Sequence, residues 1–312
     1  MAVLGYGAQG QAHALNLNDS GVDVRVGLRP ESPRRRQARA AGLRVEAVAD
    51  AVAGADIVMM LVPDAVQPGL YDSEVRSNLR PGAAVFFAHG YNVHFNRLNL
   101  RDDCDIAMVA PLGIGEQVRA QYVAGAGVPA LVAVHIDASG RARSRALAYA
   151  SAMGHGRVGV IETTFAEETE TDLFAEQAVL CGGLTHLMTA AFETLVEAGY
   201  KPEIAYFCCL HEVKLMADLV YERGIAGTRE SISATAEFGD YTRGPRIVNA
   251  SVRKAMRGML TDIQNGRFDE ELQEEHASGE PIINMGRRDA REHLIEQVGS
   301  ELRAIMKIGR GN

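Results

Sequence analysis

The sequence contains no tryptophan and only four cysteines among its 312 residues. Two of the cysteines, Cys208 and Cys209, are adjacent, which argues against the disulfide framework of a small secreted domain and predicts free thiols in a reducing compartment. No apolar run approaches the length of a membrane span, and the N-terminus lacks the charged segment of a signal peptide. These absences together predict a cytoplasmic protein with no membrane partner.

An excess of basic residues is also missing. The net charge of −8 argues against nucleic acid or an anionic membrane as the main partner. The apolar and charged fractions, 47% and 23%, are typical of a globular protein, and the length allows one large domain or two ordinary ones. We therefore expect a small-molecule partner.

A glycine-rich motif follows the first short apolar segment, residues 2–4. It reads G-x-G-x-x-G and leads directly into a helical pattern through Ala12, Ala14 and Leu15. Between a strand and a helix, such glycines permit a tight turn and close approach of a pyrophosphate, which the helix N-terminus attracts. We predict a dinucleotide site formed by Gly5, Tyr6, Gly7, Ala8, Gln9 and Gly10.

Basic and hydroxyl side chains follow the predicted second strand, residues 22–28. Folds that prefer NAD usually carry an acidic residue at this position, to bind the ribose 2′-hydroxyl. This chain instead has Arg29, Ser32 and Arg34, whose donors suit a 2′-phosphate, so the pattern favours NADP over NAD. The alternative interpretation is a solvated basic helix start.

Continuous apolar runs predict further strands at 55–62, 83–88, 106–110, 130–134 and 158–161, as expected for a sheet covered on both faces. Ligands collect at the carboxyl edge of such sheets. Asp64 and Gln67 follow one strand, His89 follows the next, and Gly115 and Glu116 follow a third. We predict an α/β Rossmann-type doubly wound sheet over residues 1–162, with His89 either structural or lining the site.

The second half, residues 163–312, has helical spacing and predicts an all-α domain, with helices near 167–200, 203–222 and 250–265 and a loop at 230–237. Asp172 and Glu176 are four residues apart, so both carboxylates lie on one helix face. Such a pair indicates either a cation site or a solvated acidic helix start.

Taken together, these segments resemble ketol-acid reductoisomerase of the short, class I form. The resemblance runs in order over nearly the whole chain, and its second-half motifs are the most specific. The matching segments are Gly5–Gly10, Pro63–Gln67, Phe87–Gly90, Glu167–Gln177, Cys209–Glu212 and Ser231–Glu237.

The resemblance implies that NADPH and two Mg²⁺ ions convert acetohydroxy acids to dihydroxy acids by alkyl migration followed by hydride transfer. It also implies a knotted helical domain and an intertwined homodimer that completes each site. By position it implies cofactor contacts from Tyr6 to Gln9, at Arg29 and Ser32, from Asp64 to Gln67, and at Gly115. It places His89 beside the reacting centre, Ser233 on the substrate, and Asp172, Glu176 and Glu212 on the metal.

Three positions depart from the family pattern. Cys208 stands where the second metal helix carries a glutamate, Leu112 replaces a lysine, and Glu116 replaces a histidine. Mg²⁺ prefers hard oxygen ligands, so we predict a weakened metal site and a slowed alkyl migration, while hydride transfer survives. His211 points away from the face shared by Cys208 and Glu212, which disfavours a Zn²⁺ site there.

These departures lead to the hypothesis of an NADPH-dependent oxidoreductase that reduces a C=N or C=O group of a non-standard substrate in a specialised pathway. Loss of a cation at Leu112 and gain of a carboxylate at Glu116 would favour a cationic substrate. Two alternatives stay open. One is a genuine reductoisomerase with an altered site, and the other is a non-catalytic NADP-binding homologue.

Overall fold

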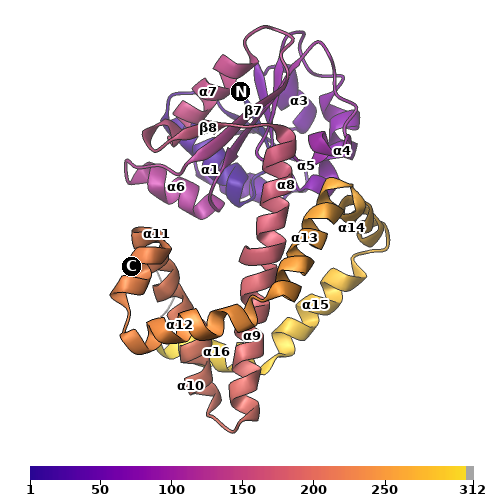
Figure 1. The fold of residues 1–312 in the computed structure, drawn as a ribbon. Helices are drawn as coiled ribbons and strands as arrows, with labels where there is room; N and C mark the ends of the chain where they lie inside the picture. Colours follow the sequence, from indigo (N-terminus) through magenta and orange to yellow (C-terminus); the bar gives the residue numbers. More distant parts are fainter. Residues whose placement is uncertain (307–312) are drawn as a thin grey trace. The chain divides into compact units, whose positions relative to one another are not determined.

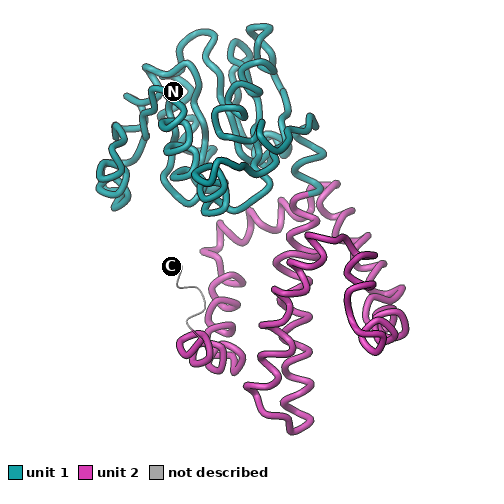
Figure 2. The backbone as a smooth tube through the Cα atoms, turned by 90° about the vertical axis from the view of Figure 1, so that its left-hand side faces the viewer, with its two compact units in different colours: residues 1–171 teal, residues 172–312 magenta. Residues whose placement is uncertain are grey.

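The computed structural model describes residues 1–306 of the chain. The chain divides into two compact units, one formed by residues 1–171 and the other beginning at Asp172 (Figure 2). Helix α8 (Phe165–Ala175) runs without interruption through the boundary between them.

Unit 1 is built on one eight-stranded sheet with the order β3-β2-β1-β4-β5-β6-β7-β8 (Figure 1). Neighbouring strands are parallel except β6 and β7, which are antiparallel. The strands are β1 (Ala2–Leu4), β2 (Arg25–Gly27), β3 (Arg44–Glu46), β4 (Ile57–Met60), β5 (Ala84–Phe87), β6 (Asp105–Pro111), β7 (Ala130–Ile136) and β8 (Val160–Glu162). The strand order reverses at β1, so the predicted Rossmann-type doubly wound sheet is confirmed.

Two separate cores cover the two faces of this sheet. Side chains alternate along each strand, so Val3 enters one core and its neighbours Ala2 and Leu4 enter the other. The first core packs against α1 (Ala8–Asp19), α2 (Arg34–Ala40), α6 (Gly115–Val123) and α7 (Ala142–Ala152). The second packs against α3 (Val48–Ala53) and the π-helical turn η2 (Tyr71–Val75). Short helices η1 (Asp64–Val66), α4 (Gln67–Leu70), α5 (Tyr91–His94) and η3 (His155–Arg157) complete the unit.

Strand β3 was not predicted, and β2 is shorter than the segment 22–28 that was predicted for it. Strand β3 lies at the sheet edge and reads Arg-Val-Glu, without the apolar run that marks a central strand. Its pairing with β2 supplies the regularity that its own sequence lacks.

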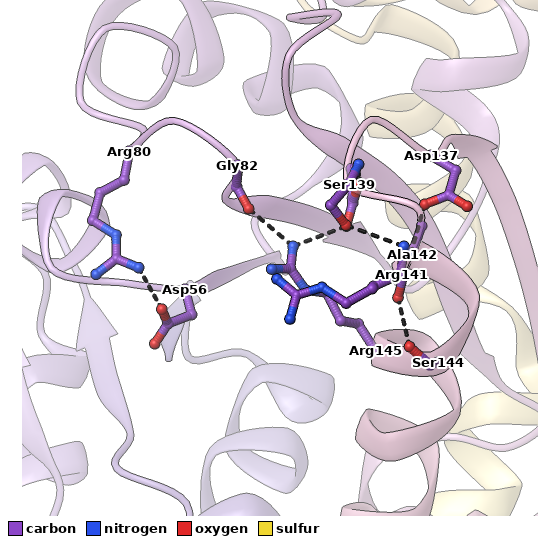
Figure 3. Close-up of polar contacts among 10 residues, drawn as sticks. Asp56, Arg80, Gly82, Asp137, Ser139, Arg141, Ala142, Ser144 and Arg145 are labelled. Carbon is purple, nitrogen blue, oxygen red and sulfur yellow. Dashed lines mark hydrogen bonds and ion pairs between the residues drawn. The ribbon is translucent and has the colours of Figure 1, made fainter.

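A buried carboxylate fixes the amino end of β6. Asp105 is fully buried and accepts hydrogen bonds from the backbone N–H of Ser139 (2.8 Å), the Ser139 hydroxyl (2.7 Å) and Nη1 of Arg145 (2.8 Å). Arg145 also donates to the Gly82 carbonyl (2.9 Å), which ties helix α7 to the loop before β5 (Figure 3). Asp105 therefore links the start of β6 to the turn after β7 and to helix α7.

The second unit consists of helices. They are η4 (Glu176–Leu180), α9 (Gly182–Glu197), α10 (Pro202–Tyr206), η5 (Phe207–His211), α11 (Glu212–Ser231), α12 (Ala234–Ile247), α13 (Ala250–Gln264), α14 (Arg267–Ala277), α15 (Pro281–Glu292) and α16 (Leu294–Met306). Segments η4 and η5 are π-helical turns inserted between α-helices. The core of this unit is small and centres on Phe192, Ala205, Tyr206 and Ile295.

Two expectations about this unit are wrong. Most of the predicted loop 230–237 is helical, because the chain breaks only briefly at Ile232 and the Ser233 hydroxyl then caps α12 by accepting from the Ala236 N–H. The helical stretch Phe165–Glu197 is also long and apolar enough to cross a membrane by length and composition, contrary to the expectation that no such run exists. Only 6% of its most apolar window is buried, so most of this apolar surface is exposed.

Candidate active site

The glycine motif forms an open cradle at the carboxyl end of β1. Gly5 has φ of +102°, and a Cβ atom there would lie 2.5 Å from the Leu61 carbonyl oxygen. A Cβ atom at Gly10 would lie 2.5 Å from the Gly5 carbonyl oxygen, whereas one at Gly7 would meet nothing within 4 Å. Gly5 and Gly10 are therefore required by packing, and Gly7 leaves space above the N-terminus of α1. The residues present fit a dinucleotide pyrophosphate.

The loop after β6 is locked against this cradle. Nε2 of Gln9 donates to the Gly113 carbonyl oxygen (2.9 Å), and a Cβ atom at Gly115 would lie 2.4 Å from the carbonyl oxygen of Ala8. Leu112 and Glu116 flank this contact and are exposed. The structure thus brings Gly115 to the predicted dinucleotide site, with two of the departing positions beside it.

The arginines after β2 have different surroundings. Nη1 of Arg34 donates to the carbonyl oxygen of Tyr6 in the cradle (2.9 Å). Nη1 of Arg35 donates to the carbonyl oxygens of Leu28 (2.6 Å) and Glu46 (3.0 Å). It therefore links the carboxyl ends of β2 and β3. Arg29 is exposed and makes no ion pair or side-chain hydrogen bond within residues 1–306. Arg34 therefore supports the cradle, and the Arg29 guanidinium is available to a ligand.

A histidine–carboxylate pair lies at the carboxyl end of β5. Nδ1 of His89 lies 2.9 Å from Oε1 of Glu168, whose side chain is only 5% exposed. The backbone N–H of Gly90 donates to Oε2 of the same carboxylate (2.8 Å), and the Thr169 hydroxyl lies 3.3 Å from it. A Cβ atom at residue 90 would lie 2.9 Å from Glu168 Oε2, so glycine is required there. Because a carboxylate accepts, the hydrogen of this contact lies on Nδ1 of His89.

Asp64 and Gln67 belong to the same region. Nδ2 of Asn92 donates to the Gln67 Oε1 atom (3.1 Å) and to the Asp64 carbonyl oxygen (3.1 Å), and Gln67 Nε2 donates to Asp64 Oδ1 (3.1 Å). Burial raises the pKa of the Asp64 carboxyl, while His89 opposes the rise and the Glu168 charge adds to it. Strands β4 and β5 therefore bring Asp64, Gln67 and His89 together, as the sequence predicted for one sheet edge.

Glu168 was not among the predicted site residues. It stands four residues before Asp172 on α8, so the spacing that selected Asp172 and Glu176 also includes it. One potential ligand atom from each of His89, Glu168 and Asp172 lies within 4.8 Å of the others. Its burial, which the acidic run Glu167–Glu170 does not reveal, distinguishes it from the other glutamates of that run.

The other predicted metal and substrate residues lie on separate elements. Glu176 opens η4, Cys208 lies within η5, Glu212 opens α11, and Ser233 is the exposed N-cap of α12. In the described part of the chain, no group of three potential ligand atoms forms around Glu212 or Cys208. A donor set of three carboxylates and one thiol does not fit a pair of Mg²⁺ ions, which require hard oxygen donors in near-octahedral array.

Comparisons with known proteins agree with the geometry. The family model described as the NADPH-binding domain of acetohydroxy acid isomeroreductase matches residues 1–159, and that of the ketol-acid reductoisomerase C-terminal domain matches residues 165–308. A solved NADH-preferring ketol-acid reductoisomerase from an uncultured archean is 43% identical, with a TM-score of 0.95 over 99% of this chain and 94% of that one.

More distant structures share the fold alone. A semialdehyde dehydrogenase NAD-binding protein from Cupriavidus necator is 19% identical, with a TM-score of 0.64 over 85% of this chain and 98% of that one. A pyrroline-5-carboxylate reductase from Coxiella burnetii is 16% identical, with a TM-score of 0.53 over 85% and 95% of the two chains.

Proposed function

Because this chain belongs to the ketol-acid reductoisomerase family of oxidoreductases, we propose that it converts an acetohydroxy acid to a dihydroxy acid with a nicotinamide cofactor, at an altered site. The observation that carries the proposal is the pairing of His89 with the buried carboxylate of Glu168, at the same sheet edge as the glycine cradle. An oriented imidazole beside a dinucleotide site suits proton transfer to a carbonyl oxygen that receives hydride.

Different residues of the chain bind the cofactor, orient His89 and position the loops of the site. The glycine cradle and the N-terminus of α1 bind the pyrophosphate, and the bound nicotinamide supplies the hydride. Glu168 and the Gly90 N–H keep His89 in one orientation, with Nε2 as the proton-exchanging atom. Hydrogen bonds among Asp64, Gln67 and Asn92 link the loop after β4 to the loop after β5.

The proposed cofactor preference is NADPH over NADH. The two residues directly after β2 are Leu28 and Arg29, neither of them acidic, and Arg29 is exposed. Replacing Arg29 with glutamine should lower kcat/KM for NADPH about tenfold, the effect of one lost charge-assisted contact, with little change for NADH. Arg34→Gln should lower kcat/KM for both cofactors, because Arg34 supports the cradle itself. Equal loss with both cofactors in Arg29→Gln would contradict the assignment.

A second candidate function is reduction alone, of a C=O or C=N group. Leu112 and Glu116 beside the cradle, together with Cys208, favour it, because these residues replace a cation and a hard ligand that would assist alkyl migration. A cyclic imine in its protonated, iminium form accepts hydride at carbon and becomes a neutral amine, so it needs no such help.

One assay series separates the candidates. The purified chain would be given NADPH or NADH and either an acetohydroxy acid, its already rearranged 3-hydroxy-2-keto acid, or a cyclic imine, each with Mg²⁺ and with EDTA. Turnover of the acetohydroxy acid supports the reductoisomerase. Turnover of only the keto acid or imine supports reduction alone, and cofactor binding without any turnover would contradict both.

We also propose a second copy of this chain as the partner, in the homodimer that the family implies. The helical unit exposes many large apolar side chains, including Tyr221, which is 91% exposed, and Ile204 and Phe238. Exposed apolar surface of this extent marks an interaction site. Light scattering after gel filtration should give twice the mass of the chain, and a monodisperse monomer would contradict the proposal.

A further inference from the structure

The family resemblance implies two metal-binding helices. The second of them presents one soft donor, a thiol, and one hard donor, a carboxylate. Cys208 lies in the π-helical turn η5, and Glu212 opens α11 directly after it. Both side chains are exposed, and their spacing of four residues is close to a full helical turn, so they share one face. Whatever ion approaches this face meets a sulfur and a carboxylate.

No neighbouring group on these helices replaces the missing oxygen donor. The His211 ring packs edge-on against Phe207, with 5.6 Å between ring centroids, which commits it to a different face. Cys209 offers a second sulfur, and burial raises the pKa of its thiol, with further increases from Cys208 and Glu212. The next carboxylate of α11, Asp218, pairs with Nζ of Lys214 at 2.5 Å.

We propose that this chain binds at most one Mg²⁺ ion per site, instead of the pair that its family implies, and that Cys208 is the residue responsible. A Mg²⁺ ion is small and strongly hydrated, and it exchanges water only for well-placed oxygens. Three carboxylates suffice for one such ion with water in the remaining positions. Two adjacent ions need a further carboxylate to bridge or balance their charge, and a thiol does not supply it. The inference rests on the proposed function in one respect, because it takes Asp172, Glu176 and Glu212, the residues that the family resemblance implies, as the metal donors.

The stoichiometry of bound Mn²⁺, a spectroscopic substitute for Mg²⁺, tests the proposal without any assay of activity. Titration of the metal-stripped full chain, followed by calorimetry and electron paramagnetic resonance, should show one ion or fewer per chain and no spectrum of a coupled pair. Two ions per chain with a coupled spectrum would overturn the proposal.

The substitution Cys208→Glu should create the second site. The variant is expected to bind two Mn²⁺ ions per chain, with the second bound at least about tenfold more tightly than any second ion in the wild type. Cys208→Gln, which has the same length without the charge, is the matched control and should behave as the wild type. A Cys208→Glu variant that still binds one ion would show that another residue is responsible, and Cys208→Asp repeats the test if the glutamate variant does not fold.

The metal measurement and the activity assay can fail separately. One bound ion with no acetohydroxy acid turnover would leave this inference standing and remove the proposed function. Two bound ions with full turnover would do the reverse. Faster alkyl migration in Cys208→Glu, by about tenfold or more, would support both.

Discussion

The buried carboxylate of Glu168 gives His89 a defined orientation, and this makes a prediction at the scale of one residue. Replacing Glu168 with glutamine keeps the shape but removes the charge that holds the imidazole by Nδ1. We expect kcat to fall on the order of 10²-fold with little change in KM, and the pH–rate profile to shift, because the histidine loses its partner. Glu167→Gln is the control, since Glu167 lies next to it but is exposed. Equal losses in both variants would contradict the role.

Two buried histidines of unit 1 should make the folded protein less stable at acid pH. Burial, with the nearby His155, lowers the pKa of His13 to about 3, and burial also lowers the pKa of His155. Unfolded histidines titrate near 6.5, so the unfolded chain binds more protons below that pH. The stability from keeping them neutral is fully present above pH 6.5 and is lost as the pH falls toward the folded pKa values.

Unfolding by urea at several pH values measures this loss. The free energy of unfolding should fall below pH 6.5 by up to about 1.4 kcal/mol per pH unit for each histidine. His13→Gln should flatten the slope, and His186→Gln, at an exposed histidine, should leave it unchanged. An unchanged slope in His13→Gln would exclude it as the source.

At the scale of elements, strands that are buried on both faces were predictable, and those that depend on their neighbours were not. Apolar runs in the sequence indicate the central strands. Strand β3 has no such run, and it is regular because β2 pairs with it. The antiparallel direction of β7 has no local signal, since it lies in a long-range pairing with β6. In the site, the residues after β4 and β5 were predictable because parallel strands end at one edge. Glu168 was missed because its burial depends on tertiary packing.

The Asp105 anchor makes a prediction at this scale. Arg145→Met leaves the fully buried Asp105 with only Ser139 as a donor, and removal of one partner from a buried pair costs about 3–5 kcal/mol. Arg143→Met on the same helix breaks an exposed pair with Glu162, which contributes about 0–1 kcal/mol. Chemical denaturation of both variants measures the difference. Similar small losses would show that the Ser139 hydrogen bonds alone hold β7.

At the scale of the whole molecule, the two units differ in how they reach stability. Unit 1 encloses two cores within its own chain, whereas the helical unit has a small core and many exposed apolar side chains. A chain of this kind gains stability from association, so its melting temperature should rise with protein concentration. Tyr221→Glu places a charge on the most exposed aromatic residue of α11 and should weaken the proposed dimer, lower the melting temperature and remove its dependence on concentration. Ala40→Glu adds the same charge to exposed helix α2 of unit 1 and should change none of these quantities. If Tyr221→Glu keeps the mass and melting behaviour of the wild type, the contact between copies lies elsewhere on the helical unit, and Ile204→Glu on α10 is the next substitution to measure.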